Sequence, residues 1–109
     1  MLVTTAEVDE IRKAAGSHEL FLYLDVEQGE WLLPRAVFLL QEKLNAYASF
    51  VLDGKMREIY PWAVARNVRV VVRSRGQPPL QALELIARAN GLLGEAGPVI
   101  SLERVAAPQ

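Results

Sequence analysis

Few side chains in this sequence have the types and spacing that catalysis or metal binding needs. His18 is the single histidine and there is no cysteine, so zinc sites built on paired histidines, thiolate catalysis and disulfides are excluded. A serine–histidine pair would have to use His18, but the chain has no nucleophile-elbow motif. We expect His18 to be a solvent-facing turn residue. The sequence identifies no catalytic residue, no metal site and no cofactor.

Acidic side chains offer a weaker route to catalysis. Asp25 could pair with Glu30 or Glu42, but nothing in the sequence fixes the distance between them, and a catalytic pair needs environments that separate the two pKa values. The segment GLLGEAG, residues 91–97, follows a helical pattern and has no lysine, so it indicates a helix end and not a phosphate loop. The residues favour a binding module over an enzyme.

Arginines on one predicted strand suggest another kind of partner. If the leucines of residues 19–26 face the core, one side of the sheet carries the following side chains: Arg69, Arg73, Arg75, Phe21 and Tyr23. Aromatic rings beside arginines on an open sheet can stack single-stranded nucleic acid. The alternative is that the arginines pair with acids such as Asp25 and Glu103. A net charge of −1 argues against nucleic acid as the partner.

The elements that position these residues follow from apolar periodicity and turn residues. We predict strands at residues 19–26, 68–75 and 98–105, long helices at 34–54 and 80–97, and a short helical turn and loop at 55–67. This order predicts a single domain, residues 1–109, with an α/β (α+β) two-layer sandwich fold. A small mixed sheet of three or four strands would carry both long helices on one face. Residues 106–109 are expected to fray.

The N-terminal segment, residues 1–18, gives a weaker pattern. Thr4, the acidic residues after it and Gly16 are helix start and stop signals, but Val8 and Ile11 provide only a thin apolar stripe. The segment shows no signal peptide, and no apolar run in the chain is long enough to span a membrane. We therefore expect a cytoplasmic protein without a membrane partner.

Both long helices carry more apolar surface than one small domain needs. Beside its core stripe, the helix at 34–54 has a second stripe of Leu39, Ala46 and Phe50, with Lys43 between them. In the helix at 80–97, apolar residues extend far around the axis. Either the loop near Tyr60 and Trp62 covers the second stripe, or a second copy of the chain or another partner does. The predicted interface residues are Leu39, Lys43, Phe50, Leu85 and Leu92, and a homo-oligomer, most simply a dimer, is the favoured partner.

One helix segment is specific enough to suggest a family. The segment LLQEKLNAY spans residues 39–47, and the residues that accompany it are Asp25, Trp31, Phe50, Gly54, Tyr60, Pro61, Pro78 and Pro79. Over about residues 20–105, this pattern resembles a family of small uncharacterised bacterial proteins, a domain of unknown function. The resemblance implies no activity or ligand. It implies an extended segment before the strand at 19–26, so a β-hairpin is an alternative to a helix at residues 5–15.

Polar residues of the motif allow two interpretations. Gln41 and Asn45 lie one helical turn apart, and with Lys43 they could support the loop at 55–67, while the Lys43 ammonium reaches an aspartate or solvent. Alternatively, a small-ligand or enzyme pocket could form from five residues: Asp25, Trp31, Gln41, Asn45 and Tyr60.

Overall fold

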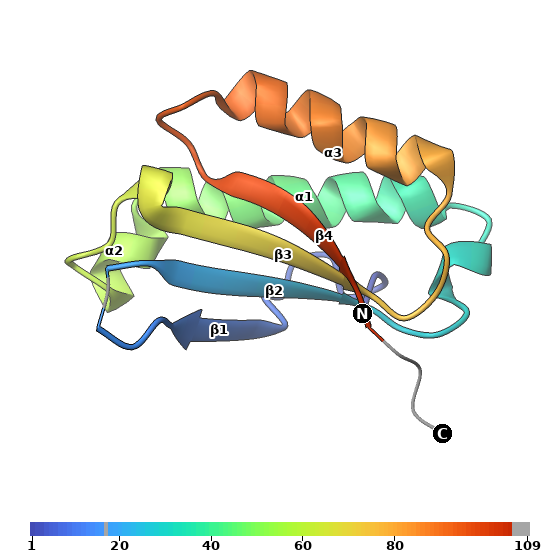
Figure 1. Cartoon of the computed structure of the whole chain (residues 1–109), viewed down its shortest axis with the longest axis horizontal. Coiled ribbons are helices and arrows are strands. Elements are labelled where there is room, and N and C mark those ends of the chain that lie inside the picture. The colour runs from blue at the N-terminus through green and yellow to red at the C-terminus, as the bar shows by residue number, and fades with distance from the viewer. Residues whose placement is uncertain (17, 106–109) are drawn as a thin grey trace.

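The computed structural model describes residues 1–16 and 18–105 and contains a four-stranded mixed sheet (Figure 1). The strands are β1 (Glu10–Lys13), β2 (Leu20–Val26), β3 (Val68–Ser74) and β4 (Val99–Arg104), in the spatial order β1-β2-β3-β4. β1 is antiparallel to β2, whereas β2, β3 and β4 run parallel. The α+β class and the mixed sheet agree with the prediction. The tail at 106–109, predicted to fray, lies outside the described residues.

Helical segments make the connections between the parallel strands. They are η1 (Glu30–Leu32), α1 (Ala36–Leu52), α2 (Lys55–Ile59), η2 (Ala65–Asn67) and α3 (Leu80–Leu93). α1 lies between β2 and β3 in the chain and α3 between β3 and β4, and the two helices run alongside each other in Figure 1. Within the described ranges, no helix combines the length and hydropathy that a bilayer crossing requires.

The N-terminal segment forms a hairpin and not the helix that its capping signals favoured. Residues before Glu10 make turns, and β1 then pairs with β2, with Ile11 opposite Leu22. Pairing with an adjacent apolar strand outweighs the local helix signals of Thr4 and Gly16, because propensity is a weak determinant beside tertiary contacts. Of the two alternatives for residues 5–15, the structure contains the hairpin.

The core lies on one side of the sheet, as the period of two in the strands predicted. In β2 and β3, alternate residues are almost fully buried: Leu20, Leu22, Leu24, Val26, Val68, Val70 and Val72. They belong to one hydrophobic cluster with residues from both long helices: Leu40, Leu44, Tyr47, Val51, Ala82 and Ile86. The opposite side of the sheet therefore carries the polar and aromatic positions between them.

The outer edge of β4 is closed at one position by a helix side chain. The N–H of Val105 donates to the carbonyl oxygen of Ser74 in β3 (2.8 Å). Backbone groups of successive residues point alternately to the two sides of a strand. Those of Ile100 therefore point away from β3, to the free edge. There the Asn90 amide donates to the Ile100 carbonyl oxygen and accepts from the Ile100 N–H, both at 2.8 Å. Asn90 thus takes the place of a neighbouring strand.

Candidate functional site

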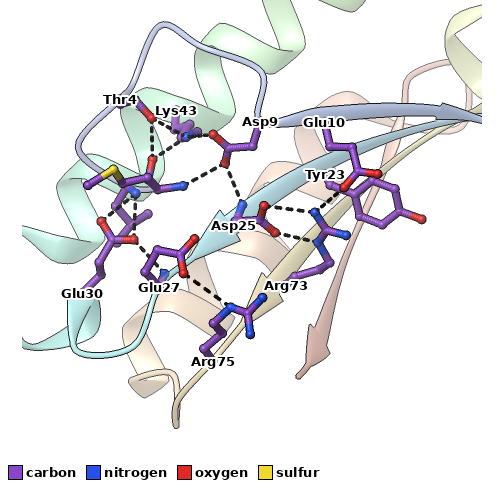
Figure 2. A network of polar contacts seen from close by, with 12 residues as sticks. Thr4, Asp9, Glu10, Tyr23, Asp25, Glu27, Glu30, Lys43, Arg73 and Arg75 are labelled. Atoms are coloured by element: carbon purple, nitrogen blue, oxygen red, sulfur yellow. Dashed lines mark hydrogen bonds and ion pairs between the residues drawn. The ribbon is translucent and has the colours of Figure 1, made fainter. Parts of the chain in front are cut away.

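Arg73 lies at the centre of an ion-pair cluster on the side of the sheet opposite the core (Figure 2). Its guanidinium bonds both carboxylate oxygens of Asp25, at 2.6 and 3.0 Å, and Glu10 at 2.8 Å. It also lies 4.1 Å from the ring centroid of Tyr23, a cation–π distance. Hydrogen bonds to Asp25 raise the pKa of Arg73, and the bonds from Arg73 and Arg12 lower the pKa of Glu10.

Each arginine of the predicted nucleic-acid surface has an acidic partner in its own chain. Arg69 pairs with Glu19 at 3.0 Å and Arg75 with Glu27 at 3.4 Å, in addition to the pairing of Arg73. A phosphate would have to compete with these carboxylates, since electrostatic binding of nucleic acid depends on available cations. The ion-pair alternative is confirmed for Asp25, whereas Arg69 and Arg75 pair with Glu19 and Glu27 and not with the predicted Glu103.

Lys43 is the centre of a buried cluster that the sequence did not predict as a unit. Its side chain has 0% exposure, and its ammonium donates to Asp9 Oδ1 at 2.8 Å, to Thr4 Oγ1 at 3.0 Å and to the carbonyl oxygen of Met1. The other oxygen of Asp9 accepts from the backbone N–H of Asp25 at 2.7 Å and from the Met1 amino group at 2.9 Å. Figure 2 shows Lys43 reaching from its helix to these groups. Lys43, predicted at an interface, is therefore occupied by residues 1–9 of its own chain.

Two further contacts hold the N-terminal segment in place. The Glu30 carboxylate, on a residue only 8% exposed, accepts from the Leu2 N–H at 2.9 and 3.1 Å and from the Glu27 N–H at 2.7 Å. The buried Tyr47 hydroxyl donates to the Tyr23 carbonyl oxygen at 2.6 Å and accepts from the Asp9 N–H at 2.9 Å. Burial raises the pKa of Tyr47, so this hydroxyl keeps its proton and remains a donor.

The second apolar stripe of α1 is covered in part by this same segment. Leu39 and Phe50 are half-buried and pack against the core. Ala6 and Val8 face Ala46 and Phe50 across a shallow cavity of about 270 Å³. Residues of the N-terminal segment therefore lie beside this stripe, where Thr4 and Asp9 also bind Lys43. The sequence could not anticipate this, because the path of residues 1–9 depends on polar contacts to distant elements.

The Asp9–Lys43 contact predicts how stability depends on pH. Burial alone would raise the pKa of Asp9, but bonds from Lys43, the Asp25 N–H and the Met1 amino group hold it below the usual pKa of an aspartate. A carboxylate with a lowered native pKa stabilises the fold above its unfolded pKa and loses that contribution as the pH falls through the native value. We expect the free energy of unfolding to decline below about pH 4.

Denaturant titrations at several pH values between 7 and 2.5 measure this decline. Asp9→Asn should show a shallower fall, and Glu103→Gln, which removes an exposed carboxylate on β4, should follow the wild type. If Asp9→Asn and the wild type decline in parallel, the lowered pKa of Asp9 does not contribute to the acid sensitivity.

The structure does not bring the five residues of the predicted ligand pocket together. Asp25 pairs with Arg73, as described above. The Trp31 indole N–H donates to the Ser74 hydroxyl at 2.7 Å, and the ring of Tyr60 packs edge-on against Trp62 with the centroids 5.9 Å apart. His18, predicted to face solvent, is exposed. Asp25, Trp31 and Tyr60 thus have local structural partners.

Gln41 and Asn45 instead face α3 and not the loop at 55–67. They line a surface groove of about 270 Å³ with four residues of α3: Leu85, Arg88, Ala89 and Leu92. An adjoining hollow of about 130 Å³ has an apolar lining that includes Leu44, Ala48, Leu93 and Ile100. The structure therefore joins two predicted ligand residues with two predicted interface residues. The groove lining combines apolar side chains with the two amide groups of Gln41 and Asn45 and the guanidinium of Arg88.

Comparisons with known proteins show to which family the chain belongs. Neither the curated proteins nor the solved structures gave a match to this chain. A family model described as "Family of unknown function (DUF6572)" matches residues 1–106, which includes the LLQEKLNAY segment and the N-terminal hairpin. The chain belongs to this family of unknown function, DUF6572.

Proposed function

We propose that this chain is an interaction module that self-associates through the outer surfaces of α1 and α3. The observation that carries the proposal is the exposure of Leu92, which is 90% accessible beside the groove between the two helices. Other large apolar side chains are exposed on the same helices: Phe38, Leu52, Leu80 and Leu83. Large apolar side chains exposed on two neighbouring helices are typical of a protein–protein contact.

A second copy is the partner that this surface favours. In the two-layer arrangement that we propose, α1 and α3 form one layer and leave their outer faces to solvent or to a partner. Closed two-fold dimers are the commonest homo-oligomers, because one patch then covers itself. Pairing of Arg69, Arg73 and Arg75 with acids leaves the opposite side of the sheet less suited to a charged partner.

Sedimentation of the whole chain over 1–100 µM tests the proposal. We expect a concentration-dependent dimer, and we expect Leu92→Gln to weaken it about tenfold or more, because burying a leucine contributes roughly 1.5–3 kcal/mol. Leu32→Gln is the matched control, since Leu32 is 88% exposed but lies in η1; it should leave the association unchanged. A wild-type chain that stays monomeric at 100 µM would overturn the proposal.

A further inference from the structure

The outer surface of α3 carries one continuous ridge with a symmetric order of residue types. Its members, four residues apart along the helix, are Leu80, Glu84, Arg88 and Leu92. Residues at this spacing lie next to one another on a helix and form a ridge that can pack against a neighbour. All four are exposed, with Leu80 at 66% and Leu92 at 90%. From either end, the ridge begins with a leucine and has its two charges at the centre.

The two central charges have no partner within the described chain. In residues 1–16 and 18–105, neither the Glu84 side chain nor the Arg88 side chain forms a hydrogen bond or an ion pair. An acid four residues before a base is the favourable order for a pair within one helix, yet the structure does not contain that pair. Both groups are therefore available to a partner.

We propose that two copies of the chain pack α3 against α3 in antiparallel orientation, around a two-fold axis between Glu84 and Arg88. This rests on the proposed self-association and specifies its surface. Reversal of the ridge places Leu80 opposite Leu92 of the partner subunit and Glu84 opposite Arg88 of the partner subunit. The axis repeats each contact, so two ion pairs form at the centre with a leucine pair on each side. Such charge complementarity fixes orientation and register.

The free edge of the sheet is a poorer surface for the same partner. Asn90 occupies the edge groups of Ile100, which leaves Leu102 and Arg104 as the next edge positions of β4. A two-fold antiparallel pairing that uses both of them would place Glu103 opposite Glu103 of the partner subunit, and like charges directly opposite are destabilising. The helix ridge would bring opposite charges together, whereas this edge would bring like charges together.

Charge reversal tests the pairing with the full chain. E84R and R88E should each weaken the dimer about tenfold or more, because each homodimer then places like charges together. An equimolar mixture of E84R and R88E should restore dimers of mixed composition, which native mass spectrometry identifies by mass. E58R is the matched control, because Glu58 is an exposed acid on the short helix α2 and lies outside both proposed contact surfaces, and it should behave as the wild type.

The outcomes separate the two proposals. A monomeric wild type would overturn both the self-association and the ridge pairing. A dimeric wild type whose affinity is unchanged by E84R and R88E would overturn the ridge pairing alone. Loss of the dimer in both variants without recovery in the mixture would also overturn it, provided that circular dichroism shows both variants folded, since a general disturbance of α3 would have that result.

Discussion

Asp9→Ala should lower the free energy of unfolding by about 3–5 kcal/mol, the range for removal of one partner from a buried ion pair. The Lys43 side chain has 0% exposure, and its ammonium lies 2.8 Å from Asp9. After the substitution the ammonium keeps contacts to Thr4 and the Met1 carbonyl oxygen, but neither neutralises its charge. Since domains of this size have a total stability of about 5–15 kcal/mol, the effect is large. Urea titration at pH 7 measures it.

A double-mutant cycle shows whether the effect comes from the unpaired cation. Lys43→Met replaces the ammonium with an apolar chain of similar length, so Asp9→Ala combined with Lys43→Met should cost less than the sum of the two single substitutions. Glu42→Ala, at an exposed position next to Lys43 in the sequence, should change stability by no more than about 0.5 kcal/mol. Additive effects of Asp9→Ala and Lys43→Met would contradict the assignment.

This cluster also marks where prediction from the sequence ends. The long helices and the central strands were predictable, because their apolar periods are strong and Pro34, Gly54 and the Pro78–Pro79 pair delimit them. For β1 the sequence offered no such pattern. That strand is four residues long, and its place is set by pairing with β2 and by Asp9, neither of which leaves a local signal.

Candidate site residues were predictable singly but not in their combination. The wide apolar arc of α3 indicated Leu85 and Leu92, and the family motif indicated Gln41 and Asn45, as two unrelated sets. They meet in one groove because the strand order places α1 beside α3. Helical periodicity defines the faces of each helix, whereas the strand order decides which faces meet.

Lys43 shows the same distinction at a single residue. Its position within an apolar stripe indicated that its methylenes would cover neighbouring apolar groups and that its ammonium would reach an aspartate or solvent. Which aspartate it reaches depends on the turn at residues 1–9, and the structure identifies Asp9. A cation inside an apolar helix stripe is a usable signal for a buried ion pair even when its partner is not predictable.

Tyr47→Phe should lower the free energy of unfolding by about 2–3 kcal/mol. The Tyr47 hydroxyl joins three elements: it projects from α1, donates to the Tyr23 carbonyl oxygen in β2 and accepts from the Asp9 N–H just before β1. Phenylalanine fills the same core volume, so the loss comes from two backbone groups that no longer have their partner and lie where water has little access.

Hydrogen exchange distinguishes this cause from general destabilisation. In Tyr47→Phe, the Asp9 amide should lose protection beyond the change that the lower global stability imposes, while amides of β3 should follow the global change. Tyr60→Phe is the control, because the described contacts of Tyr60 are made by its ring against Trp62, and it should alter stability by no more than about 0.5 kcal/mol. Equal losses in the two variants would show that the Tyr47 hydroxyl does not join the N-terminal segment to the core. The difference between them therefore measures the hydroxyl contacts separately from the packing of an aromatic ring.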